Sequence, residues 1–210
     1  MKCTKVQKRH IKQKKPNESK MIINIIISLI FPLFFIGLEG FSQIDENIIY
    51  WNKERKLTWD DFKGTPEPTN GRIASNVGGV YIYFKQLNFI NIEVKVLNVF
   101  DKKLSWTTTN LLSVLEHEQL HSDIREVHAR LLRKQIIESH FKSIKEANLK
   151  VQEFHNLIQT DLNLMQEEYD KETGLSGNQK KQKEWNEKIR LKLLELENFA
   201  QSTIIIKIDK

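Results

Sequence analysis

The amino-acid sequence predicts an α+β fold, with antiparallel strands first and three long helices after them. Two observations support this prediction. Segments in which apolar and polar residues alternate precede Trp106, and three segments with apolar residues spaced three or four apart follow it. A run of strands followed by a run of helices is typical of α+β domains. Residues 43–210 are therefore expected to form a single domain.

The strands are expected in the first half of this domain. The first is a short strand-like piece, Leu57–Phe62, followed by a loop rich in Gly, Pro and Asn. The segments GGVYIYFK and NFINIEVKVLNVF are rich in β-branched and aromatic residues. In the second of these, the apolar positions that alternate with polar ones are Ile90, Ile92, Val94 and Val96. Such alternation indicates a half-buried strand.

Helical spacing begins after Trp106 and defines three stretches. The first can be capped by Thr109 or Asn110 and is expected to run to about Ser139. The second covers roughly 144–170 and is broken by the glycines of ETGLSGN. The third covers about 179–199, and its apolar stripe consists of Trp185, Ile189, Leu193 and Leu196. The final segment, TIIIKI, fits either an edge strand or a frayed end.

Residues 1–42 have the order of a signal peptide. A basic segment is followed by the apolar run MIINIIISLIFPLFFI and then by GLEGFSQ, in which Gly40 and Ser42 are small residues before Gln43. Cleavage near Ser42 and export to the periplasm, cell envelope or extracellular space are therefore predicted. The alternative is an uncleaved membrane anchor at residues 21–38, because the run is slightly long for a signal core.

The net charge of +6 belongs to this leader. Eight of the 33 Lys and Arg residues but only two of the 27 Asp and Glu residues fall within residues 1–42, which leaves 25 of each sign elsewhere. Without a basic stripe on the domain, no nucleic-acid partner is expected. The single cysteine, Cys3, lies before the apolar run, so the exported domain has no disulfide and no thiolate ligand.

The first helical stretch contains the sequence HEQLH, in which His117, Glu118 and His121 form an HExxH motif. Residues four apart share a helical face, so both imidazoles can bind one ion while Glu118 lies beside them. Zn²⁺ binds neutral imidazole nitrogens at about 2.0–2.1 Å and in catalytic sites keeps one position for water. The motif therefore predicts a zincin-like site, with His117 and His121 as zinc ligands and Glu118 as the general base.

Two imidazoles need a third protein ligand, and the candidates are acidic. Asp123 points away from the histidine pair, and Glu126 lies more than a turn beyond it, so both are expected to orient neighbours or to be solvated. His128 lies about 10 Å along the helix from His121, too far to share the ion. Better candidates lie at the end of the second helical stretch, in EEYDKETG, at Tyr169, Asp170 and Glu172.

These motifs resemble a family of secreted bacterial proteins, domain of unknown function 922 (DUF922), whose members are suspected zinc-dependent proteases. The resemblance rests on HEQLHSDIREVHARLLRK, LTWDDFKGTPEP, YDKETG and QKEWNEKI, which span most of residues 43–210. It implies a secreted HExxH metallohydrolase. The positions of this chain that match the family are His117, Glu118, Gln119, His121, Asp123, Tyr169, Asp170, Glu172 and Trp185.

The chain departs from the family at two positions. Leu120 replaces a usual Gly, and Leu175 stands where family members often have a His. If that His is the usual third ligand, an oxygen must replace it here. Glu172 is preferred over Asp170, because its longer side chain is expected to leave from the point where the helix breaks.

Three functions remain open from the sequence. The first is a zinc metallopeptidase of the cell envelope that acts on a peptide or protein substrate. The second is a weakened or inactive binding or scaffold domain that retains the fold, an alternative that Leu175 favours. In the third, the HExxH match is incidental and the histidines only pack.

Overall fold

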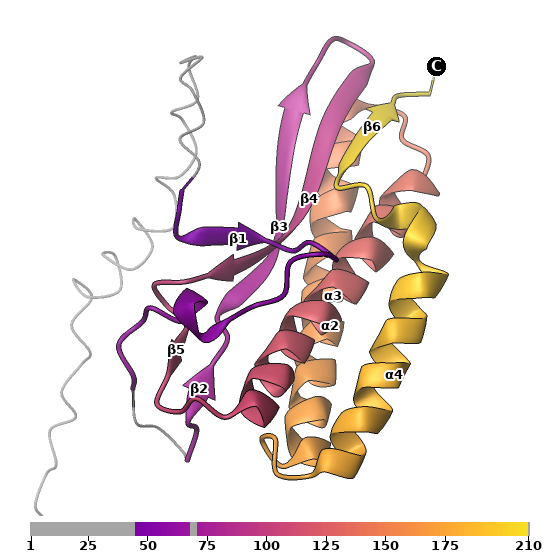
Figure 1. Ribbon diagram of the computed structural model, residues 1–210. Helices are drawn as coiled ribbons and strands as arrows, with labels where there is room; N and C mark the ends of the chain where they lie inside the picture. The colour runs from indigo at the N-terminus through magenta and orange to yellow at the C-terminus, as the bar shows by residue number, and fades with distance from the viewer. Residues whose placement is uncertain (1–44, 68–70, 210) are drawn as a thin grey trace, which may run out of the picture. The chain divides into compact units, whose positions relative to one another are not determined.

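In the computed structural model, which describes residues 45–67 and 71–209, a β-sheet packs against a layer of three helices (Figure 1). The strands are β1 (Ile48–Tyr50), β2 (Ala74–Ser75), β3 (Gly78–Gln86), β4 (Asn91–Asp101), β5 (Trp106–Thr107) and β6 (Thr203–Lys207). The helices are α2 (Leu112–Ile137), α3 (Ile144–Thr173) and α4 (Gln179–Glu195). Antiparallel strands followed by three helices confirm the α+β prediction.

The predicted signal peptide lies outside the described residues. Within the part of the chain that the structure describes, no helix is long and apolar enough to cross a membrane.

Strand β4 is the centre of the sheet. It pairs antiparallel with β3 along one edge, and with β6 and β1 along successive parts of the other. Ile92, Val94 and Val96 are buried, as their alternation predicts, and they form the core together with residues of the helices. Ile90 precedes the strand and is 37% exposed, so the alternation begins one step later than expected.

The C-terminal segment is an edge strand. Thr203–Lys207 pairs with Asn91–Lys95 of β4, and Ile204 and Ile206 turn inwards to the core. This pairing decides between the two readings of TIIIKI, because buried isoleucines and a hydrogen-bonded register oppose fraying.

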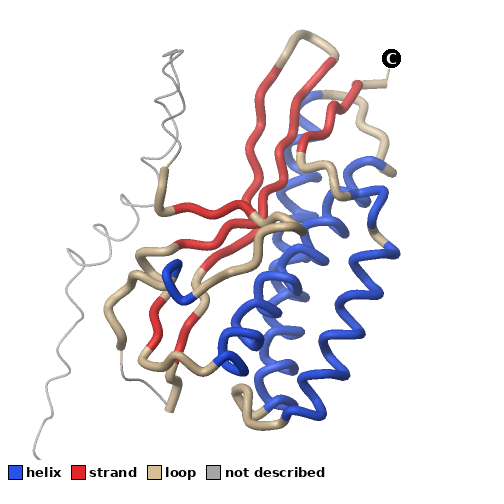
Figure 2. The backbone as a smooth tube through the Cα atoms, in the orientation of Figure 1, coloured by secondary structure: helices blue, strands red, loops and turns tan. Residues whose placement is uncertain are grey.

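Helix α2 is the central helix of the layer, and α3 also contacts β3; Figure 2 shows the helices beside the strands. Helix α2 contacts both β3 and β4 of the sheet and both of the other helices, α3 and α4. Polar residues of its second half are therefore buried and need partners. Glu126 pairs with Arg130 at 3.2 Å and with Arg133 at 2.8 Å. His128 contacts the Ile124 carbonyl at 2.8 Å through Nδ1, which makes it a packing residue.

Two of the local predictions are wrong. Leu57–Phe62 is no strand: it contains the 3₁₀ helix Trp59–Asp61, because the Asp61 carboxylate accepts a hydrogen bond from the Thr58 backbone N–H at 2.9 Å and closes a turn. Helix α2 is capped by neither Thr109 nor Asn110, since Leu111 is its N-cap and provides no side-chain hydrogen bond.

Helix α3 extends to Thr173, three residues beyond the expected end. It ends on Gly174, whose φ of 57° is in the left-handed region that suits glycine. The backbone N–H groups of Gly174 and Leu175 both donate to the carbonyl of Asp170. Asp170 and Glu172 are therefore both helical, and the face on which each lies is set by the helix.

Candidate metal centre

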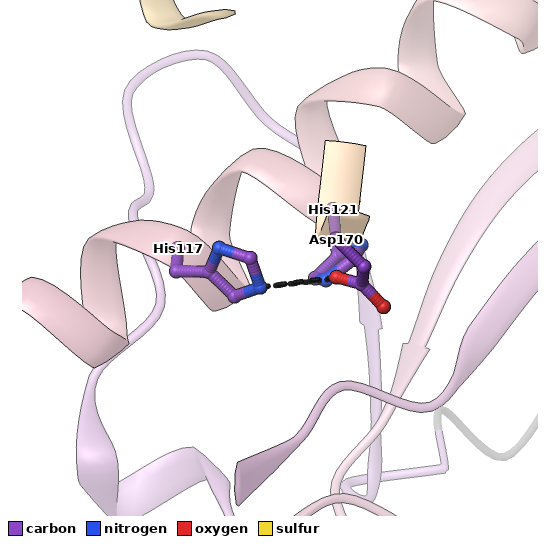
Figure 3. A group of neighbouring side chains, drawn as sticks. All are labelled: His117, His121 and Asp170. Carbon is purple, nitrogen blue, oxygen red and sulfur yellow. Dashed lines mark hydrogen bonds and ion pairs between the residues drawn. The ribbon is translucent and has the colours of Figure 1, made fainter. Parts of the chain in front are cut away.

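Helices α2 and α3 bring three donor atoms together. His117 and His121 come from adjacent turns of α2, and Asp170 comes from the facing part of α3 (Figure 3). Asp170 Oδ1 lies 3.2 Å from His117 Nε2 and 3.0 Å from His121 Nε2. The two Nε2 atoms lie 3.2 Å apart. These three residues form a group that could hold a metal ion.

The triangle of donor atoms has the size that a zinc site requires. Ligand atoms at the corners of a tetrahedron with bonds of about 2.0–2.1 Å lie about 3.3 Å apart. The edges found here are 3.0–3.2 Å. The three atoms thus match one face of such a tetrahedron and leave the fourth corner for a water or substrate oxygen.

A buried glutamine fixes the tautomer of His117. The Gln182 side chain donates to Asn186 Oδ1 at 2.9 Å, and its Oε1 accepts from the Tyr169 hydroxyl at 2.8 Å. Oε1 also lies 3.3 Å from His117 Nδ1. Because an amide oxygen can only accept, Nδ1 carries the proton and Nε2 has a free lone pair.

A second glutamine holds His121 in the same way. Gln166 donates from Nε2 to the His121 carbonyl at 3.1 Å, which turns its Oε1 towards His121 Nδ1. Two Nε2 lone pairs and one carboxylate oxygen therefore converge on one point. This arrangement is repulsive unless a proton or a metal ion lies among the three atoms, so the residues fit a bound metal.

Tyr169 supports the pair from behind. Its ring stacks on the His117 ring, with centroids 4.5 Å apart and an interplanar angle of 19°. Its hydroxyl also lies 3.2 Å from the His117 carbonyl. Burial raises the pKa of Tyr169, although its contact with Gln182 opposes that rise, so the hydroxyl keeps its proton and remains a donor.

The electrostatics of the group favour positive charge between the rings. Burial alone would raise the pKa of Asp170, but its contacts with His117 and His121 outweigh burial and lower it. Burial would likewise lower the pKa of His121, but Asp170 and the charge of Glu118 raise it. Asp170 is therefore an ionised carboxylate at neutral pH, the form that binds a metal.

Glu118 lies in the wall of the cavity that contains the histidine pair. The cavity has a volume of about 380 Å³, and Glu118 is only 5% exposed. Its carboxylate accepts no hydrogen bond from the described residues. The carboxylate oxygens are also accessible to solvent. A water that enters the cavity can therefore donate to it.

Glu172 does not reach the histidine pair, which corrects the preference for it as third ligand. Its carboxylate accepts from Trp185 Nε1 at 2.9 Å and lies 3.5 Å from Lys181 Nζ. The reason is the length of α3: since the helix continues to Thr173, position 172 faces α4 whereas position 170 faces α2. Asp170, the predicted alternative, is the carboxylate beside the histidines.

The remaining predicted residues lie outside the triangle. Asp123 accepts from Trp51 Nε1 at 2.7 Å and from Gln119 Nε2 at 2.9 Å, so it orients neighbours as expected. Leu175 lines the same cavity as the histidines and has a φ of 52°. An oxygen of Asp170, rather than a residue at position 175, completes the donor set.

The sequence reasoning missed Gln166 and Gln182. Gln166 precedes Asp170 by four residues, so helical spacing alone places both on one face of α3 and could have identified it. Gln182 has no such signal, because its position beside His117 depends on how α4 packs against α2.

Comparisons with family models, with curated proteins and with solved structures found no match for this chain. The resemblance to domain of unknown function 922 therefore rests on the sequence motifs alone.

We expect Gln166→Met and Gln182→Met each to lower the affinity for Zn²⁺ by about 10–100-fold, because each variant frees a ring that the amide now orients. Competition with a chromogenic chelator measures this affinity. Gln152→Met, on the exposed part of α3, is the control and should change nothing. Wild-type affinity in both site variants would show that the amides do not orient the ligands.

Proposed function

We propose that the protein is a zinc-dependent hydrolase that cleaves peptide bonds. The observation that carries this proposal is the convergence of His117, His121 and Asp170 beside the unpartnered carboxylate of Glu118 in an open cavity. Two histidines and a carboxylate with a free fourth position are the donor set of many catalytic zinc sites.

Each residue has a role in this reaction. Zinc, when bound, polarises the substrate carbonyl and makes a nearby water more acidic. Glu118 takes a proton from that water as the water oxygen bonds to the carbonyl carbon. It then passes the proton to the leaving amine as the C–N bond breaks. Gln166 and Gln182 keep the histidines in the ligand tautomer throughout.

A strand in the cavity wall supports an extended peptide as the substrate. One wall is formed by residues 71–76, which include β2. Within the described residues β2 pairs only with β5, so its other edge has no strand partner. An extended chain can add to such an edge through backbone hydrogen bonds.

We infer export from the leader alone. A basic segment, an apolar core and small residues before Gln43 are typical of a signal peptide. The substrate would then be a peptide or protein of the cell envelope or its surroundings.

The experiment is metal analysis joined to a hydrolysis assay. We expect the purified protein to contain about one equivalent of zinc and to cleave unfolded casein. Cleavage should stop after dialysis against a chelator and should recover when Zn²⁺ is added. Absence of metal from the wild type, with His117→Ala equally stable, would sink the proposal and leave an incidental motif.

The second candidate is a binding or scaffold domain that keeps the metal without turnover. Leu175 favours it, because an apolar side chain lines the cavity where related proteins are expected to have a histidine. Bound zinc with no cleavage of casein or of a peptide library would make this the leading function.

A further inference from the structure

Arg125 follows His121 by one more helical step on the face of α2 that carries the two histidines. Positions 117, 121 and 125 are each four residues apart, so their side chains lie along one face. Arg125 is 4% exposed, yet it lines the same cavity as His117, His121 and Glu118.

This guanidinium is buried without an ion pair. Nη2 donates to Asn76 and, at 2.9 Å, to Ser122 Oγ, and Nε lies 3.4 Å from Asn98 Oδ1. Nη1 has no hydrogen-bond partner among the described residues, and it is accessible to solvent. Burial lowers the pKa of Arg125 to about 10, which still leaves the group charged at neutral pH.

Neighbouring arginines on the same helix show how unusual this is. Arg130 and Arg133, equally buried, both pair with Glu126. Among the described residues, no carboxylate lies within ion-pair distance of Arg125, so its removal from water is offset only by the more distant charges of Glu118 and Asp123. Arg125 is thus a buried charge with one donor nitrogen left open beside the candidate metal centre.

The charge of the cavity favours an anionic ligand. Its charged side chains are two carboxylates, Glu118 and Asp170, and two guanidiniums, Arg72 and Arg125. These cancel, so a divalent ion on neutral histidines would leave a net charge of about +2. Arg72 lies at the rim, half exposed, 3.4 Å from Asp170.

We propose that Arg125, assisted by Arg72, binds a carboxylate of the substrate, so that the cavity selects peptides with a carboxylate close to the cleaved bond. The carboxylate belongs either to an acidic side chain or to the chain terminus. This proposal rests on the proposed function for its peptide, but the binding that it describes requires no cleavage.

The test compares peptides that differ only in a carboxylate, bound to zinc-loaded Glu118→Gln protein so that none is cleaved. Acetyl-Ala-Glu-Ala-amide and acetyl-Ala-Gln-Ala-amide probe a side-chain carboxylate. Acetyl-Ala-Ala as free acid and as amide probes the chain terminus. We expect one carboxylate peptide to bind about tenfold or more tightly than its partner by calorimetry, as a charge-assisted hydrogen bond provides. Equal affinities in both pairs, or binding of none, would overturn the proposal.

Variants assign the preference to the arginines rather than to the metal. Arg125→Met should abolish the preference for the carboxylate peptide. Arg72→Gln should reduce this preference, and it serves as the test if Arg125→Met does not fold. Arg190→Gln, an exposed arginine of α4 paired with Glu187, is the control and should keep it. A preference retained in every folded site variant would overturn the role of the arginines. A preference that they remove, in a protein that never cleaves peptides, would support this inference and reject the proposed function.

Discussion

Asp170→Ala should lower the affinity for Zn²⁺ by more than about 100-fold, whereas Glu172→Ala should leave it unchanged. Substitutions of residues that only orient a ligand typically cost about 10–100-fold, and loss of a ligand should cost more. Asp170 Oδ1 lies within 3.2 Å of both Nε2 atoms, while the Glu172 carboxylate is turned to Trp185. Chelator competition on the three proteins measures the difference.

Glu172→Ala is a demanding control, because it removes a carboxylate two residues away on the same helix. If Glu172→Ala instead lowered the affinity for Zn²⁺ and Asp170→Ala left it unchanged, α3 would have to end at a different residue when metal binds. Leu175→His adds a further check. If Asp170 already completes the donor set, a histidine at position 175 should not raise the affinity more than about tenfold, which is less than an added ligand would give.

The histidine pair and the sheet could be predicted because local spacing determines both. Positions four apart on a helix share a face whatever the helix packs against, so His117 and His121 needed no tertiary information. The alternation in β4 likewise identified Ile92, Val94 and Val96 as core residues, and the structure confirms it.

The third donor could not be chosen from the sequence because it depends on where α3 ends. A helix that stopped at Asp170 would free the Glu172 side chain to turn, but three more helical residues direct it to α4 instead. A shift of two positions along a helix rotates a side chain by about 200°, so a small error in the boundary reverses the assignment.

The long-range partners were beyond the sequence for a different reason. Gln182 reaches His117 across 65 positions of the chain, and Asn76 reaches Arg125 across 49. Neither contact follows from local periodicity, since each depends on which face of one element packs against another. Local periodicity likewise does not distinguish Arg125, which donates to Ser122, from Arg130 and Arg133, which pair with Glu126.

Glu118→Gln should reduce kcat for peptide hydrolysis by about 10²–10⁴-fold while the affinity for Zn²⁺ changes little. A general base contributes a factor of this size. Glutamine has nearly the same shape as glutamate but cannot take a proton from water. The Glu118 carboxylate is outside the donor triangle, so the ligand atoms of His117, His121 and Asp170 are all retained.

Glu116→Gln provides the matched control. It makes the same chemical change on the same helix two residues earlier, on an exposed side chain that accepts from Asn186. Its kcat should equal that of the wild type. A Glu118→Gln protein as fast as the wild type would mean that another group takes the proton from water. If the wild type binds zinc but hydrolyses no peptide, the scaffold function should replace the peptidase.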